Sequence, residues 1–415
     1  METKTRVGPL GESWRAWIAL AVGVLAVSGH SMLHYGISPL MKTITEDLSW
    51  SRSSYAQAVN FRLLLMMAII PFAGALADRW GPRAVLTAGA GLVGLGVVSL
   101  SRMETLPFFF ASNVLIGPGQ AFIGSVAGSA LVLRLFRKRQ GLAIGILNGG
   151  DNLITGLVHS LSAFLLLEYG WRGALSSLSI GYFVLAVLIW SVLTKDEGRS
   201  TSNPGGGDDA SGDSAAADAP PAVTEIPWRD YRLWLLILTY IGIYSFVTSI
   251  GFHFPAFRQD MGSRADEAAW LYSFSTVVGG FGSILIGWIS ERLTARTTLL
   301  GVVIALMLSS VILWMPVGEG SLYGWAFFYG IANAGGVALL ALTLSEMFGD
   351  AAIGKIMGFA MVFCMGATVV GNWFTAAVFD NFGGYIAAWQ AYTIVLACAA
   401  IPAFFLRRTV ETIEP

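Results

Sequence analysis

The sequence predicts an all-α membrane protein whose twelve transmembrane helices form two bundles of six, with both termini in the cytoplasm. Of its 415 residues, 55% are hydrophobic and 12% are charged, about half the charged fraction of an ordinary soluble protein. The charges are clustered and leave apolar runs of about 20 residues, the length of helix that crosses a ~30 Å hydrocarbon core. A polar segment in the middle of the chain separates these runs into two sets of six.

Each apolar run is expected to be a helix, because a backbone in lipid must satisfy its own hydrogen bonds. The runs also lack the strict alternation of membrane-barrel strands. The first run is too long for a signal peptide and lacks a small-residue cleavage pattern, so it counts as a span. The runs cover approximately residues 16–37, 54–77, 84–101, 107–133, 140–167, 173–193, 232–256, 268–290, 297–315, 322–345, 355–379 and 386–406.

The distribution of Lys and Arg predicts the orientation of the spans. With the N-terminus inside, 18 of the 25 basic residues face the cytoplasm, six face outside and one, Arg62, lies within a span. This excess follows the positive-inside rule and requires an even number of spans, so both termini are predicted to be cytoplasmic. We therefore expect a multi-pass integral protein of the plasma (inner) membrane, surrounded by the lipid bilayer.

Residues 194–230 form a polar, low-complexity tract rich in Gly, Ala, Ser, Pro and Asp. Such a composition predicts a flexible cytoplasmic linker. It divides the chain into an N-terminal bundle (1–193) and a C-terminal bundle (231–415), related by an axis along the membrane normal. Glycines are dense in several spans, notably around Gly119, Gly149 and Gly282, and this density predicts close helix–helix packing.

A turn motif between the second and third spans recurs in weaker form in the second half of the chain. The two copies read Gly74-Ala-Leu-Ala-Asp78-Arg79-Trp-Gly81-Pro82-Arg83 and Gly287-Trp-Ile-Ser-Glu291-Arg292-Leu-Thr-Ala-Arg296. An acidic side chain here can pair with an Arg or with a helix N-terminus and so bias one conformation. The first copy is expected to be the stronger latch. The candidate gating residues are Gly74, Asp78, Arg79, Gly81, Arg83, Glu291 and Arg292.

The six-plus-six plan with its Asp78-Arg79-Trp-Gly81 turn resembles the major facilitator superfamily, over nearly the whole chain. Finer features resemble its monocarboxylate/oxalate–formate porter branch: Leu48-Ser-Trp50-Ser-Arg52, Arg134-Leu-Phe136-Arg-Lys138-Arg139, Gly170-Trp171-Arg172 and His253. The resemblance implies a monomer whose two bundles rock around a central substrate site.

Several positions depart from what this resemblance implies. Relatives often carry an Arg after the glycine of span eight that holds a substrate carboxylate, but here Ser283 follows Gly282. The basic residue that oxalate carriers use in span eleven is missing, since the sequence there reads Phe363-Cys364-Met365-Gly366. The branch alone therefore does not give the substrate.

Two charged residues lie well inside predicted spans, Arg62 and Asp151. Counted from the opposite ends of their helices, they lie about 12 Å and about 16 Å deep, at nearly the same level of the membrane. Charges at this depth are costly and mark functional sites by default. Arg62 is expected to bind an anionic group of the substrate, and Asp151 to carry the coupled proton. The alternative is a structural ion pair between the two.

All four histidines lie in predicted spans. His30 and His34 share a helix face, and they are candidates for substrate binding, with His30 also a candidate for proton coupling. For His159 and His253, hydrogen bonding near the ends of their spans is the simpler explanation. The remaining candidates for substrate contact are neutral polar residues, for which helix–helix hydrogen bonding is the alternative: Gln120, Asn148, Asn152, Tyr244, Asn333 and Asn372.

These observations predict a secondary active transporter of a small organic anion, best a monocarboxylate, that works by alternating access with proton symport. An anion exchanger or exporter, a carrier of inorganic anions such as nitrate, and a membrane sensor that transports nothing are the alternatives. No phosphate-binding GxxxxGK[ST] loop or hydrolase spacing is present, so neither an enzyme nor ATP coupling is expected. The two cysteines offer no metal spacing, and no cofactor, metal or nucleic-acid partner is predicted.

Overall fold

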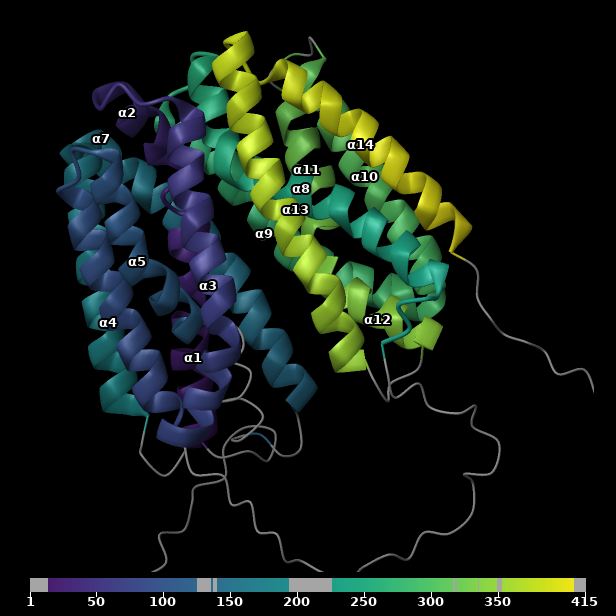
Figure 1. The fold of residues 1–415 in the computed structure, drawn as a ribbon, viewed down its shortest axis with the longest axis horizontal. Coiled ribbons are helices and arrows are strands. Elements are labelled where there is room, and N and C mark those ends of the chain that lie inside the picture. Colours follow the sequence, from purple (N-terminus) through teal and green to yellow (C-terminus); the bar gives the residue numbers. More distant parts are fainter. Residues whose placement is uncertain are drawn as a thin grey trace, which may run out of the picture.

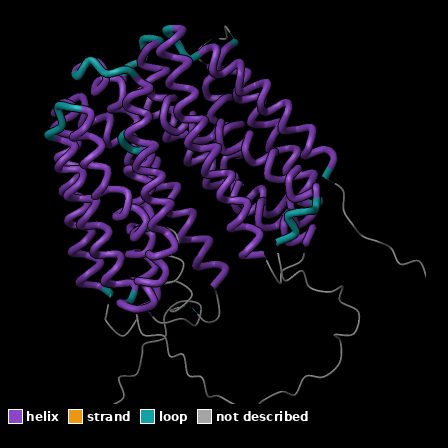
Figure 2. The backbone as a smooth tube through the Cα atoms, viewed as in Figure 1, coloured by secondary structure: helices purple, strands orange, loops and turns teal. Residues whose placement is uncertain are grey.

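A computed structural model describes residues 14–124, 136, 140–193, 226–315, 318, 320–334, 336–348 and 353–406. Throughout these residues, all regular structure is helical (Figures 1 and 2). The all-α prediction is confirmed. Most of the predicted linker, and part of the basic motif Arg134–Arg139, lie outside the described residues.

In the first half of the chain, the described residues form five long helices and two short ones. A break interrupts the longest of them, α7, at Gly170, where φ is 66°, a value that glycine adopts without strain. The break falls between the predicted spans 140–167 and 173–193. The elements are α1 (Trp14–Tyr35), η2 (Ser38–Leu40), α2 (Met41–Asp47), α3 (Arg52–Trp80), α4 (Pro82–Ser101), α5 (Leu106–Ile123) and α7 (Gln140–Val192).

The described residues of the second half form seven helices, and two of these, α8 and α10, begin at a capping side chain. Asp230 accepts a hydrogen bond from the backbone N–H of Arg232 (2.9 Å) and begins α8. Thr294 caps α10, and the Glu346 carboxylate also accepts from the backbone N–H of Ala295 (3.1 Å). The helices are α8 (Tyr231–Asp260), α9 (Ala265–Arg292), α10 (Ala295–Trp314), α11 (Gly320–Ala334), α12 (Gly336–Phe348), α13 (Ile353–Phe382) and α14 (Ile386–Phe405).

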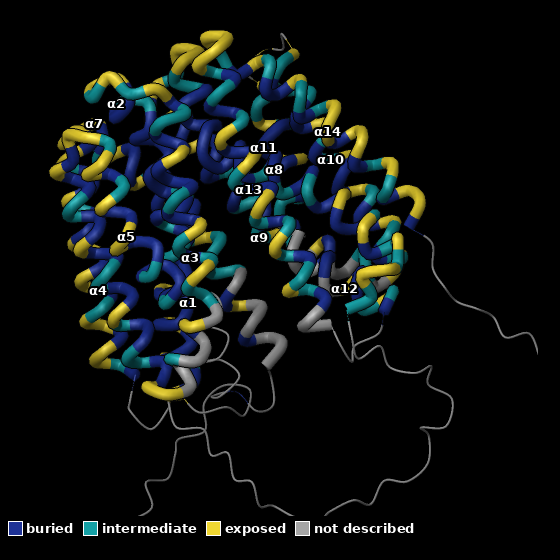
Figure 3. Tube along the Cα trace, viewed as in Figure 1, coloured by how far each residue is buried: buried dark blue, intermediate teal, exposed yellow. Residues whose placement is uncertain are grey.

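Nine helical segments of the described chain are long and apolar enough to cross a membrane. Large apolar side chains such as Leu157, Phe281 and Ile394 are exposed on the outside of the helices, as a lipid-facing surface requires (Figure 3). The membrane class is therefore confirmed, whereas the number of twelve spans and the side of the termini stay predictions.

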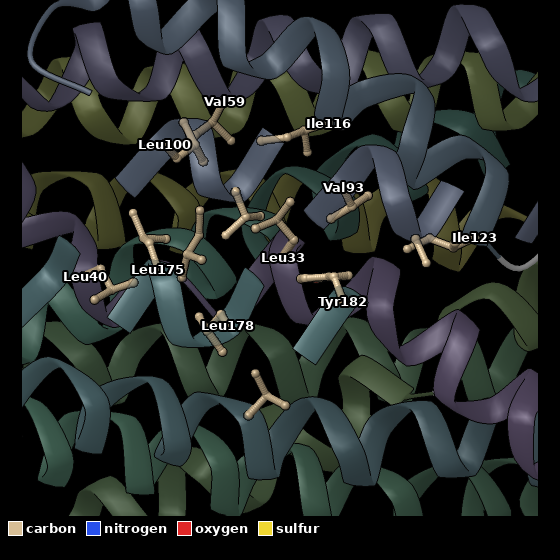
Figure 4. Packing of buried hydrophobic residues seen from close by; sticks show 14 of the residues in the cluster. Leu33, Leu40, Val59, Val93, Leu100, Ile116, Ile123, Leu175, Leu178 and Tyr182 are labelled. Carbon is tan, nitrogen blue, oxygen red and sulfur yellow. The ribbon is translucent and has the colours of Figure 1, made fainter. Parts of the chain in front are cut away.

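The helices form two bundles, and each contains an apolar cluster (Figure 1). Figure 4 shows the first cluster, where Leu33 of α1, Val59 of α3 and Ile116 of α5 pack with Leu178 and Tyr182 from the second part of α7. This cluster extends across to the second bundle through Phe252 and Ala256 of α8.

Glycines allow close helix approach at some of the expected positions. A Cβ at Gly119 would lie 2.9 Å from the carbonyl oxygen of Gly89, and one at Gly282 would lie 2.6 Å from the Cα of Ile331. Gly149 differs, because nothing lies within 4 Å of the position of its Cβ. Its neighbour Gly150 makes the close approach instead, because a Cβ there would lie 2.5 Å from Cγ1 of Val24 in α1.

Gly330→Ala is expected to destabilise the C-terminal bundle, because the new Cβ would lie 2.3 Å from the carbonyl oxygen of Ser275. Forcing these two helices apart should cost about 1–3 kcal/mol. The matched control is Gly301→Ala in α10, where nothing lies within 4 Å. Thermal unfolding in detergent compares the two variants, and equal midpoints would contradict the close contact.

Candidate functional site

A cavity of about 330 Å³ lies between the two bundles, at the middle of their helices. Its walls come from both halves of the chain. The lining residues are Val27, His30, Ser31, His34 and Tyr35 of α1, Leu63, Met66 and Met67 of α3, Asp151 of α7, Ile243, Tyr244, Val247 and Thr248 of α8, Asn333 of α11, and Met365 and Thr368 of α13.

Asp151 is the one charged side chain among the described residues that line this cavity. Its carboxylate accepts hydrogen bonds from the hydroxyls of Ser31 (3.0 Å) and Thr155 (3.4 Å). No cation pairs with it in the described part of the chain. Asp151 is therefore held by neutral donors and faces the cavity, as a proton-carrying group must.

The side chains of His30 and His34 stack with their ring centroids 5.8 Å apart, and both line the cavity. The Nδ1 atoms of both rings are buried without a hydrogen-bond partner. Gln120 lies behind them and donates to the backbone carbonyl of His30 (3.0 Å). Gln120 therefore supports the histidine wall and does not line the cavity.

Arg62 is completely buried inside the N-terminal bundle and does not line the cavity. None of its three guanidinium nitrogens has a hydrogen-bond partner among the described residues, and no ion pair with Asp151 forms there. Arg62 is thus a buried cation that has no partner in the described chain and lies outside the cavity lining.

The other candidates for substrate contact are divided between three places. Tyr244 and Asn333 line the cavity, and Asn152 lines a smaller compartment next to it. Asn372 lies farther along α13, where it contacts the other bundle. The side chain of Asn148 lies outside the described residues.

The predicted gating turn is found between α3 and α4. Helix α3 ends at Trp80, Gly81 has a φ of 85°, and Pro82 begins α4. Arg79 is exposed, and the guanidinium of Arg83 lies 4.0 Å from the centre of the Trp190 ring. Arg292 ends α9. The side chains of Asp78 and Glu291, and the surroundings of Gly74, lie outside the described residues, so the latch stays a prediction.

At the opposite end of the helices, charged residues that the sequence analysis did not select join the two bundles. Arg52 at the start of α3 pairs with Asp260 at the end of α8 (2.9 Å), and Lys42 of α2 pairs with the same carboxylate (3.0 Å). The guanidinium of Arg52 also donates to the hydroxyl of Tyr385. These residues could have been found in the sequence by looking for opposite charges at the outer ends of the predicted spans.

Asp380 of α13 extends this seal by capping a helix of the other bundle. Its carboxylate accepts from the backbone N–H groups of Arg52 (3.0 Å) and Ser53 (2.8 Å), the first residues of α3. These N–H groups have no partner within their own helix, and a negative charge here is favourable to the helix dipole.

A buried hydrogen-bond chain continues the seal toward the cavity. Asn60 of α3 accepts from the side chain of Asn372 (2.8 Å), whose amide oxygen lies 2.9 Å from Nε2 of His253 in α8. The bundles meet at this end and diverge toward the α3–α4 turn (Figure 1). The space between the bundles is thus sealed at this end, and the cavity lies on the side of the seal that is toward the α3–α4 turn.

Residues 22–367 match the family model of the Major Facilitator Superfamily. The chain belongs to the major facilitator superfamily. The expected resemblance is confirmed, and the protein is a multi-pass membrane protein of a transporter family and not an enzyme.

Similar curated members of the superfamily include monocarboxylate transporters. Monocarboxylate transporter 13 of Rattus norvegicus is 26% identical over 83% of this chain and 79% of its own. Monocarboxylate transporter 11 of Mus musculus is 32% identical over 42% of this chain, and the match spans 38% of the mouse protein. An uncharacterized transporter, YycB of Bacillus subtilis (strain 168), is 23% identical over 88% of this chain and 86% of its own.

Solved structures of other superfamily transporters share the fold. One is a bacterial homologue of the human lysosomal transporter Spinster in an inward-facing and occupied conformation, with a TM-score of 0.76, 14% identity and coverage of 95% of this chain and 97% of that one. A mutant of the nucleoside transporter NupG also gives a TM-score of 0.76, with 12% identity and coverage of 94% of this chain and 100% of that one. At these identities the likeness supports the fold alone.

In this superfamily member, Asp260→Asn is expected to open the seal, because Arg52 and Lys42 lose their shared counter-charge. The closed population should fall about tenfold, equivalent to ~1.4 kcal/mol. Spin labels at Ser51→Cys and Asn381→Cys, which are both exposed, would report a longer distance. The control is Asp47→Asn, which breaks the exposed Asp47–Arg172 pair within one bundle. An equal distance in both variants would exclude a sealing role.

Proposed function

We propose that the protein is a secondary transporter that carries a small organic anion, best a monocarboxylate, together with a proton. The observation that carries the proposal is Asp151, a carboxylate with neutral hydrogen-bond donors at the wall of a cavity between two bundles. The seal on one side of this cavity fits alternating access, in which the closed end and the open end exchange.

The charges around the cavity favour coupling of an anion to a proton. A substrate carboxylate beside Asp151 would face a like charge at short range, which disfavours ionisation of both groups. Protonation of Asp151 removes this repulsion, so anion and proton bind together. The described lining offers the anion neutral donors such as Tyr244, Thr248 and Asn333.

Arg62 supports an anionic substrate from behind the cavity wall. A buried cation without a counter-charge is costly, and a bound anion reduces that cost. His30 and His34 of the same bundle line the cavity. The similarity to monocarboxylate transporters supports the same substrate class.

The coupling residue is tested with Asp151→Asn, which keeps the shape of the side chain but cannot ionise. Substrate binding should persist, uptake should become independent of pH, and proton uptake with the substrate should be lost. Proteoliposomes with an internal pH dye measure both fluxes. Asp151→Glu, the control, should retain pH dependence. Acidification on substrate entry in the Asn variant would assign coupling to another group.

The anion preference is tested with Arg62→Met, which keeps an unbranched side chain without the charge. Carboxylate affinity should fall about tenfold, because a charge several Å away still contributes ~1–3 kcal/mol at an effective dielectric constant of ~20. Arg62→Lys should restore much of the affinity. Calorimetry on the purified protein measures both. Since Arg62 has no partner, the Met variant should unfold no earlier than the native protein. An unchanged carboxylate affinity in the Met variant would show that Arg62 does not contribute to substrate binding.

A further inference from the structure

The space between the bundles has a large and a small compartment. The large one has a volume of about 330 Å³, and the small one about 70 Å³. They share five lining residues, so they adjoin each other, and Asp151 lines both. The shared residues are Ser31, Tyr35, Asp151, Val247 and Asn333.

The large compartment has a mainly apolar wall. Met66 and Met67 of α3 face Met365 of the other bundle across the space, with further aliphatic side chains between them. Methionine is flexible and polarisable, and it adapts to aromatic and irregular apolar ligands. A volume of this size corresponds to the lower end of the range for pockets that enclose drug-sized molecules. It is far larger than a two-carbon or three-carbon acid needs.

The small compartment is polar on nearly every side. In addition to the shared residues it is lined by Asn152, Thr155, Tyr272, Thr276 and Tyr329. Several of these groups are already bonded within the protein; Tyr329, for example, donates to the carbonyl of Val247 (3.2 Å). Its volume is that of about two water molecules, or of one carboxyl or amide group.

Three polar groups in this compartment have no partner. Among the described residues, the side-chain amides of Asn152 and Asn333 and the hydroxyl of Tyr35 make no hydrogen bond. None of the three is among the fully buried polar atoms without a partner, so they are open to the space beside the Asp151 carboxylate and free to bond the polar end of a ligand. They come from α1, α7 and α11 and therefore from both bundles.

We propose that the substrate is an amphipathic acid with an aromatic or branched apolar body. Its polar head binds in the small compartment beside Asp151, Asn152 and Asn333, and its body fills the methionine-lined compartment. That the head is negatively charged follows from the proposed function, the transport of an organic anion. The requirement for a body rests on the volume and lining of the large compartment, and it holds for an acid or for a neutral analogue.

The experiment varies body and head independently, by calorimetry on the purified full-length chain in lipid nanodiscs. One series lengthens the body from acetate through butyrate and hexanoate to 4-phenylbutyrate, and a second uses the corresponding amides. Affinity should rise about fourfold per added methylene in both series until the compartment is full. Acids should bind more tightly than amides at every length.

Variants separate binding in the cavity from partition into lipid. Met365→Trp fills the large compartment and should reduce the gain per methylene, with the largest loss of affinity for hexanoate and 4-phenylbutyrate. Met365→Ala enlarges the large compartment, so the gain in affinity per methylene should continue to longer acids. This variant provides the test if the Trp variant does not fold. Asn333→Leu should weaken all acids by one common factor. The control is Met261→Trp at the exposed end of α8, which should change nothing.

Two results would overturn the inference. Equal affinity for acetate and 4-phenylbutyrate would contradict the requirement for an apolar body. If acids still bind more tightly than amides in that case, the proposed anionic substrate would remain supported. If affinity depends on chain length in the same way in the native protein and in both Met365 variants, the length dependence comes from partition into the lipid. Conversely, a gain with length in acids and amides alike, without any preference for acids, would support the compartments and contradict the anionic substrate.

Discussion

The structure depends on one constraint, which is that a polar group facing hydrocarbon must find its partner within the protein. Backbone groups satisfy it by forming helices. Polar side chains satisfy it by lying between helices, and above all between the two bundles. The seal around Arg52 and Asp260, the hydrogen-bond chain through Asn372, and the cavity at Asp151 all lie there. The functional surface is therefore internal.

Three helices carry both the cavity and its seal. Along α3, Arg52 joins the bundles and Met66 lines the cavity; along α8 the same order holds for Asp260 and Tyr244. In α13, Asp380 caps α3, whereas Met365 faces the cavity. Residues of the seal and of the cavity wall therefore lie on the same helices, and in α8 Pro255 lies between Tyr244 and Asp260.

Asp151 and Arg62 are at similar depth but have different environments. Asp151 has two hydroxyl donors and faces an open space, whereas Arg62 is enclosed without a partner. An ion pair between them would have neutralised both. Its absence in the described chain leaves a negative group at the cavity wall and a positive one buried within the N-terminal bundle.

The sequence by itself determined the helical membrane fold, the α3–α4 turn and the two intramembrane charges, because long apolar runs, Gly81-Pro82 and buried charges are local signals. It also placed Asp151, His30 and Tyr244 among the candidates that line the cavity. Only the tertiary structure decided that Arg62 and Gln120 lie behind the wall, and that Arg52, Asp260 and Asp380 form a seal. The reason is rotational: sequence fixes the depth of a residue along a helix, but only packing against neighbours fixes the face on which its side chain lies.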